Sequence, residues 1–180
     1  MVQYKIIFTG PVGAGKTTAI HSISDIPPIK TDAVASDMTK SRKAETTVAM
    51  DYGVLTLEGS EKIHLYGTPG QERFDFMWDI LTQGGIGLVL LLDNTRKDPF
   101  VDLKFFLDAF SSFIENTGVA IGVTRMDLNS QPTIEEYHQK IKEFNINPPI
   151  FAVDARVEND VSLLLQSLLY SIDPGVVGEV

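Results

Sequence analysis

The stretch GPVGAGKT, residues 10–17, is the strongest indication of fold class in this sequence. It fits the pattern G-x-x-x-x-G-K-[S/T], directly after an apolar strand and at the predicted start of a helix. Glycines let such a loop turn its N–H groups toward a phosphate, and the helix N-terminus adds the positive end of a dipole. Lys16 can then meet the β- and γ-phosphates, and the Thr17 hydroxyl can bind Mg²⁺. An ordinary glycine-rich turn would not need this Lys-Thr pair, so we predict a phosphate-binding loop.

The composition restricts the kinds of protein that this chain can be. At 180 residues and 43% hydrophobic it can bury one substantial core, and we expect a single domain over residues 1–180. A formal net charge of -9 argues against nucleic acid or anionic lipid as a partner, since both need clustered Lys and Arg. Because there is no cysteine, we expect no disulfide and no prenyl or palmitoyl anchor. Neither a signal peptide nor a bilayer-spanning apolar run is present, so we expect a cytoplasmic protein.

Six aliphatic runs predict six strands. They are YKIIFTG, VAMDYGVLTL, KIHLYG, IGLVLLLD, VAIGVT and IFAVDA. The runs that begin at Ile86, Val119 and Ile150 are apolar on both faces, which is typical of central strands in a parallel sheet. Helical periodicity occurs at about 16–23, 74–83, 99–115, 133–144 and 159–171, between or after these runs. This order predicts an α/β fold with a mostly parallel six-stranded sheet and helices on both faces.

Two segments fall outside this pattern. The stretch at about 25–46 is a long irregular loop, and loops of that length in a compact domain are usually functional or mobile. The tail at about 172–180 is predicted to be flexible.

Further motifs follow the phosphate loop in an order that would bring them around one nucleotide. In YGTPGQERF, Gly70 can present its N–H to a γ-phosphate and Gln71 can orient an attacking water. In TTVAMDYG, a threonine just before a strand can close on Mg²⁺ and the γ-phosphate. In GVTRMD, Asp127 can accept hydrogen bonds from guanine N1–H and N2–H₂, which adenine does not offer. In VDAR, the Ala155 N–H can bond guanine O6.

With these motifs the chain resembles the Ras-like small GTPases, over about residues 4–170. GTPGQERF is similar to the second switch of Rab and Ras proteins, with Pro69 as in translation GTPases. Bacterial members similar to MglA also lack the Asp that normally stands at position 67, and they work with roadblock-type partner proteins. The resemblance implies a P-loop G domain that binds GTP or GDP with Mg²⁺, hydrolyses GTP slowly, and signals through two switches to an effector and a GTPase-activating protein.

The resemblance also implies a role for each matching residue. The phosphates would be held by Gly10, Val12, Gly13, Ala14, Gly15, Lys16, Thr17, Thr18 and Gly70, and the base by Thr124, Arg125, Asp127, Ala155 and Arg156. Hydrolysis would depend on Gln71, Lys16, Gly70 and Thr47, and the metal on Thr17 and Thr47. Thr47 is preferred over Thr46 as the first-switch threonine because Asp51 follows it four residues later.

The chain departs from the family pattern at several of these positions. Gly67 replaces the Asp that contacts Mg²⁺ through water, and Val12, where Ras has Gly, would crowd Gln71. Both changes should slow hydrolysis without abolishing binding. Thr124 and Arg125 replace the usual Asn-Lys, so we expect a lost amide contact to the phosphate loop and an Arg plane that can stack on the base.

Two substitutes for missing chemistry are hypotheses. Asp51 shares a strand face with Thr47 and could replace, through water, the Asp absent at position 67; the alternative is a solvated carboxylate on an edge strand. Arg42 could act as an arginine finger in cis, although a solvated basic residue in KSRK is the simpler interpretation.

Three functions are compatible with these residues. The favoured one is a GTP-hydrolysing conformational switch, supported by Gln71. The alternative is a non-hydrolysing guanine-nucleotide-binding module, motivated by Val12 and Gly67. A nucleoside or metabolite kinase would leave Asp127 and the Thr-Pro-Gly-Gln turn unexplained.

Overall fold

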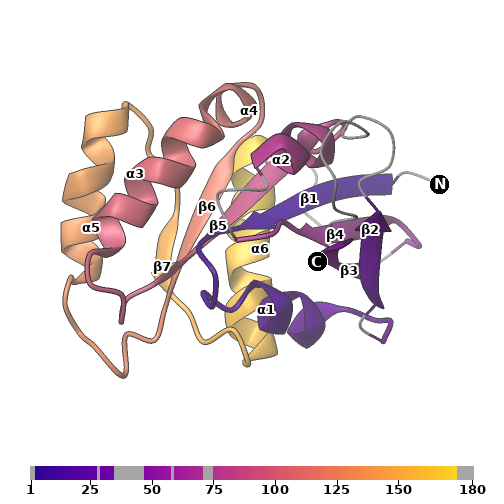
Figure 1. The fold of residues 1–180 in the computed structure, drawn as a ribbon, viewed down its shortest axis with the longest axis horizontal. Helices are drawn as coiled ribbons and strands as arrows, with labels where there is room; N and C mark the ends of the chain where they lie inside the picture. Colours follow the sequence, from indigo (N-terminus) through magenta and orange to yellow (C-terminus); the bar gives the residue numbers. More distant parts are fainter. Residues whose placement is uncertain (1–2, 28, 35–46, 58, 71–74, 174–180) are drawn as a thin grey trace.

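A single seven-stranded sheet organises the chain (Figure 1). The computed structural model describes residues 3–27, 29–34, 47–57, 59–70 and 75–173, with only the backbone described at 30–34, 47–49 and 76. The strand order is β2-β3-β4-β1-β5-β6-β7. The strands are β1 (Gln3–Thr9), β2 (Ile29–Val34), β3 (Thr47–Thr56), β4 (Lys62–Gly67), β5 (Gly87–Asp93), β6 (Val119–Thr124) and β7 (Ile150–Ala152).

The predicted fold class is confirmed, with one strand more than expected. From β4 to β7 all neighbouring strands are parallel, whereas β2 and β3 pair antiparallel at one edge. The prediction of an uninterrupted loop at 25–46 was wrong for 29–34, which forms β2. This strand gains its hydrogen bonds from β3, a partner that local sequence does not show. Residues 35–46 lie outside the described part of the chain.

Helices cover both faces of the sheet (Figure 1). They are α1 (Lys16–Ile23), α2 (Asp75–Thr82), α3 (Pro99–Ala109), α4 (Ser111–Asn116), α5 (Ile134–Ile141) and α6 (Glu158–Ile172), with a 3₁₀ turn, η2 (Lys142–Phe144), after α5. α1 and α6 pack on one face, and α2 to α5 pack on the other. The alternation of strand side chains separates two cores, with Ile6 and Phe8 facing α1 and α6 and Ile7 facing the opposite helices.

The central strands behave as their composition predicts, except at one edge. Every residue of β5 and of β6 is buried. The third doubly apolar run was expected to be central and to extend to Ala155, but β7 ends at Ala152 and lies at the sheet edge. The apolar residues beyond it still serve the core, because Val153 and Ala155 pack toward α6.

The helix predicted over 99–115 is broken in two. Phe110 leaves helical geometry, with φ -102° and ψ 11°, and separates α3 from α4. Its ring stacks on Trp78 at a centroid distance of 5.1 Å. Because this contact comes from α2, the apolar periodicity of 99–115 gave no sign of the break. A capping box formed by Thr133 and Glu136 begins α5.

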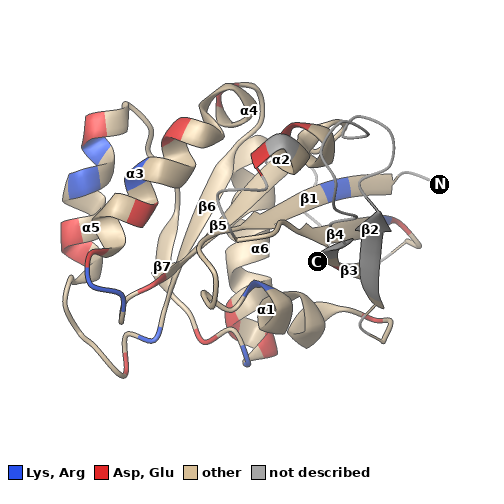
Figure 2. Cartoon of the chain, viewed as in Figure 1, with Lys and Arg blue, Asp and Glu red and all other residues tan. Residues whose placement is uncertain are grey.

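The helices on one face of the sheet carry charged residues of both signs. Figure 2 shows acidic and basic residues interspersed along α3 and α5. Ion pairs in this region include Lys104–Asp108 and Lys140–Glu143. Among the described residues, no helix is both long and apolar enough to cross a bilayer.

Trp78 offers a test of how α2 is attached. It is 4% exposed and packs on Phe105, Phe106 and Phe110. We expect Trp78→Ala to lower the free energy of unfolding by about 3–5 kcal/mol, because it leaves a cavity in this aromatic cluster. Urea unfolding followed by circular dichroism measures this change.

Ile80→Ala is the matched control, because Ile80 lies on the same helix but is 56% exposed. It should change stability by less than about 0.5 kcal/mol. Equal losses in the two variants would show that Trp78 does not anchor α2.

Candidate functional site

The predicted phosphate loop joins β1 to α1 at the carboxyl edge of the parallel strands. Lys16 is 8% exposed, and its Nζ donates to the carbonyl oxygens of Gly10 and Pro11, both at 2.8 Å. Gly70 comes close to the same group, since a Cβ on it would lie 2.7 Å from Lys16 Nζ and from the Val12 nitrogen. The loop and the turn after β4 therefore enclose one ammonium group.

Burial gives this lysine an altered acidity. Removal from water lowers the pKa of Lys16 to about 8, and the negative charge of Asp51 partly opposes the change. A phosphate arriving here would bring negative charge to an ammonium that the protein has already removed from water. The site is thus arranged for an anion.

A carboxylate from the neighbouring strand lies beside the loop. Thr17 Oγ1 donates a hydrogen bond to Asp51 Oδ2. In the antiparallel register Asp51 faces Gly67, and a Cβ on Gly67 would lie 3.1 Å from Asp51 Cβ. The absent side chain at position 67 therefore leaves the space in which the Asp51 carboxylate reaches Thr17. The chain has a carboxylate at this place, but it comes from β3 and not from the end of β4.

The start of the predicted second switch is tied to the sheet. Thr68 Oγ1 lies 2.8 Å from Thr9 Oγ1 in a buried pair, and the Thr68 N–H donates to Phe8 O. Trp78 Nε1 donates to Pro69 O at 3.2 Å. These bonds fix the backbone leading to Gly70, next to Lys16.

A hollow of about 300 Å³ opens beside the phosphate loop. Every residue predicted to hold the base lines it, together with three predicted loop residues. The predicted residues are Ala14, Gly15, Thr18, Thr124, Arg125, Asp127, Ala155 and Arg156, and the lining also includes Leu128, Val153 and Asp154. The fold thus brings motifs more than a hundred residues apart to one cavity.

Thr124 does more than the sequence predicted. Its hydroxyl lies 3.0 Å from Ala14 O and 3.1 Å from Leu92 O, and it is buried. The expected loss of a contact between this position and the phosphate loop is wrong, because a hydroxyl can donate where an amide would. The base motif and the phosphate loop remain linked.

Both arginines at this hollow are held by carboxylates. Arg125 Nη1 donates to Asp93 Oδ2 at the end of β5, so its guanidinium is fixed by this ion pair. Arg156 forms a two-pronged pair with Asp154, and these hydrogen bonds lower the pKa of that carboxyl to about 2. These ion pairs thus hold both arginine side chains in the lining of the hollow.

Sequence reasoning missed Asn94 and Tyr137. Both are fully buried, and the Tyr137 hydroxyl donates to Asn94 Oδ1 at 2.8 Å. Asn94 in turn holds the segment that carries Asp127. The available signal was the place of Asn94 directly after a buried strand, at the edge where ligands collect in such folds.

Several predicted residues cannot be placed at this site. Gln71 and Arg42 lie outside the described residues, and only the backbone of Thr47 is described, at the start of β3. Val12 is 56% exposed on the loop. Among the described residues, no three His, Asp or Glu side chains are grouped to hold a metal ion.

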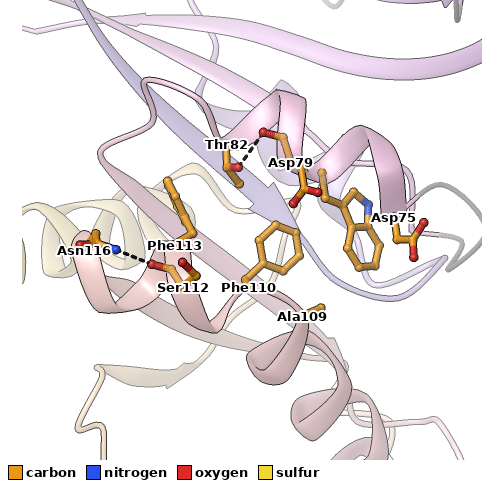
Figure 3. A pocket seen from close by; sticks show the side chains of 9 residues that line it. Asp75, Asp79, Thr82, Ala109, Phe110, Ser112, Phe113 and Asn116 are labelled. Carbon is orange, nitrogen blue, oxygen red and sulfur yellow. Dashed lines mark hydrogen bonds between the residues drawn. The ribbon is translucent and has the colours of Figure 1, made fainter. Parts of the chain in front are cut away.

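A second and larger hollow lies away from the phosphate loop. It measures about 580 Å³ and lies between α2 and the α3–α4 break (Figure 3). Figure 3 shows Phe110 and Phe113 on one side and Asp75 and Asp79 on the other. No residue predicted to bind nucleotide lines it, so its size does not make it the functional site.

Fold and site together define the class of protein. A mostly parallel sheet with a glycine-rich loop that ends in Lys16 and Thr17 is that of a P-loop nucleotide-binding protein. The family model described as "Conserved hypothetical ATP binding protein" matches residues 27–167, and the chain belongs to that family. The match begins after the phosphate loop, so the loop and the family model are separate observations.

Individual relatives extend this result. Uncharacterized protein MJ1339 of Methanocaldococcus jannaschii is 32% identical over 94 residues, 52% of this chain and 53% of that protein, so the chain spans about half its length. Ras-related protein RabC of Dictyostelium discoideum is 24% identical over 179 residues, 96% of this chain and 85% of that protein. GTP-binding protein YPT1 of Saccharomyces cerevisiae is 24% identical over 145 residues, 78% of this chain and 64% of that protein. RabC and YPT1 support the Ras-like resemblance, and none of these relatives supports the narrower bacterial, MglA-like one.

The Lys16 environment predicts an unusual titration. In the nucleotide-free protein we expect Lys16 to titrate with a pKa of about 8. Phosphate binding should raise this pKa, because the phosphate charge stabilises the ammonium. Between about 8 and 10.5 the folded protein binds fewer protons than the unfolded chain, so its stability should increase with pH across this window. NMR of ¹³C-labelled lysine, assigned with Lys16→Arg, measures the midpoint. A Lys16 midpoint near 10.5 in the free protein would contradict this account.

Proposed function

We propose that this chain is a guanine-nucleotide-dependent switch that binds GTP and GDP with Mg²⁺ and hydrolyses GTP slowly. The observation that carries the proposal is the base hollow next to the phosphate loop, with Asp127 in its lining. The Thr124 hydroxyl links the two parts of the site through Ala14 O. One ligand with a base at one end and phosphates at the other fits this arrangement.

The choice of guanine rests on hydrogen-bond chemistry. A carboxylate accepts from guanine N1–H and N2–H₂, whereas adenine presents an acceptor at N1 and no matching donor. Asp127 is exposed in the lining of the hollow, where its carboxylate can accept both bonds. The family description names ATP and one relative is named as GTP-binding, and Asp127 supports guanine as the base.

The residues present fit a magnesium ion. The ion prefers oxygen ligands, and the Thr17 hydroxyl would hold it while donating its proton to Asp51, which would contact it through water. Thr47 is the proposed third protein group. A bound Mg²⁺ would neutralise negative charge on the phosphates.

The remaining chemistry is assigned to the turn after β4. The Gly70 N–H is proposed to bond the γ-phosphate, and Gln71 to orient the attacking water. Lys16 would stabilise charge on the leaving phosphates, from the place where it now contacts loop carbonyls. Val12, exposed beside Gly70, would keep the rate low by crowding that turn.

The switch itself is part of the same proposal. An effector and a GTPase-activating protein, of which a roadblock-type protein is one candidate, would recognise the switches when γ-phosphate is bound. The rival is a binding module that never hydrolyses GTP, which Val12 and Gly67 favour.

A nucleotide panel tests the proposed function. We expect competition with a fluorescent GDP analogue to be strong for GTP and GDP and at least about a hundredfold weaker for ATP, by the loss of two bonds to a charged acceptor. Single-turnover conversion of bound GTP should be slow and should stop with EDTA. Retained GTP in Mg²⁺ over hours would favour the binding module, and preference for ATP would overturn the guanine assignment.

The position of the metal-side carboxylate gives a separate prediction. Asp51→Ala should raise the Mg²⁺ concentration needed to slow GDP release by about tenfold or more, because a group that orients the metal site is lost. Asp51→Ala combined with Gly67→Asp should restore much of the Mg²⁺ dependence, since it returns a carboxylate to the facing position on β4.

Gly67→Asp alone is the matched control. It places two carboxylates in a space where a Cβ already lies 3.1 Å from Asp51 Cβ, and it should weaken Mg²⁺ dependence. If Asp51→Ala leaves the Mg²⁺ dependence of GDP release unchanged, Asp51 has no role at the metal.

A further inference from the structure

Asn94 is a buried polar hub at the end of β5. It is 0% exposed, and its backbone N–H donates to Thr124 O at 3.0 Å. Its Nδ2 donates to Asn129 O at 2.7 Å and to Pro132 O at 3.1 Å, and its own carbonyl accepts from Asn129 Nδ2 at 2.9 Å. With the bond from Tyr137, every hydrogen-bonding group of this residue has a partner.

These bonds hold both ends of one loop. Thr124 precedes the segment that carries Arg125 and Asp127, and Asn129 and Pro132 follow it. Among the described residues no side chain donates a hydrogen bond to Asp127, and Arg156 acts on it only through charge, so the backbone of this segment sets where its carboxylate lies. Asn94 is the buried side chain that joins the far end of the segment to the sheet.

Tyr137 sets the orientation of the Asn94 amide. Its hydroxyl donates to Oδ1, which leaves Nδ2 to face the two loop carbonyls. Burial raises the pKa of Tyr137 well above its ordinary value, so the hydroxyl remains a donor. The ring is held edge-on against Phe100 at a centroid distance of 5.1 Å.

We propose that Asn94, oriented by Tyr137, is a positioning residue for base recognition, which places the Asp127 carboxylate where both of its oxygens meet guanine N1–H and N2–H₂. The inference rests on the proposed function, because it assumes that guanine occupies the hollow. It adds a determinant of base specificity that lies wholly outside the hollow, since neither Asn94 nor Tyr137 lines it.

Inosine diphosphate separates positioning from general stability. It lacks the N2 amino group, so the ratio of GDP to inosine diphosphate affinity reports the second bond to Asp127. We expect wild type to favour GDP by about tenfold or more, the worth of a hydrogen bond to a charged group, and Asn94→Ala to bring the ratio within about twofold of one. Tyr137→Phe should fall between them, and inorganic pyrophosphate should bind all variants equally because it needs only the phosphate loop.

Leu107→Ala is the control for destabilisation. Leu107 is 3% exposed in the same core and contributes no hydrogen bond to the loop, so this variant should keep the wild-type ratio. If Asn94→Ala also keeps the wild-type ratio, the positioning role is overturned while guanine binding stands. If wild type itself does not distinguish the two nucleotides, the guanine assignment fails and this inference fails with it. Should Asn94→Ala not fold, Tyr137→Phe decides by the same ratio.

Discussion

The burial of one ammonium group at the carboxyl edge of the sheet is the constraint on which this structure depends. Lys16 is held by two carbonyls of its own loop, with the negative charge of Asp51 opposing the loss of its proton. A buried charge costs free energy unless it is paired or hydrogen-bonded. The turn at Gly70 lies against the Lys16 ammonium, so the phosphate loop, α1 and the backbone after β4 meet there. A bound phosphate would neutralise the positive charge of this ammonium.

Around this centre the chain keeps a chemical group while changing the residue that supplies it. The carboxylate beside Thr17 comes from Asp51 on β3, and the facing position on β4 has no side chain. Likewise, a hydroxyl at Thr124 reaches the phosphate loop where the family pattern has an amide. In the first case a carboxylate oxygen is retained, and in the second a hydrogen-bond donor is retained. The position of such a group in the site, and not the residue that supplies it, determines what the site can bind.

The end of β5 supports the base side of the site. Asp93 fixes Arg125, and Asn94 fixes the segment beyond Asp127. Buried polar networks of this kind are costly when any member lacks a partner, and here each group of Asn94 has one. Membership of a family described as ATP-binding leaves the base open. The proposed guanine specificity depends on how firmly this network holds the segment that carries Asp127.

Local sequence pattern was enough to place several elements: α1 at 16–23, β4 at 62–67 and β6 at 119–124 lie where periodicity and the loop motif predict them. It also supplied the residues around the base hollow. Contacts between distant parts of the chain were needed to show that 29–34 is a strand, that α3 ends before Phe110, that Asp51 faces Gly67, and that Asn94 holds the base segment. Each of these depends on a partner distant in the chain, through strand register or side-chain packing, and periodicity within one segment carries no information about such a partner.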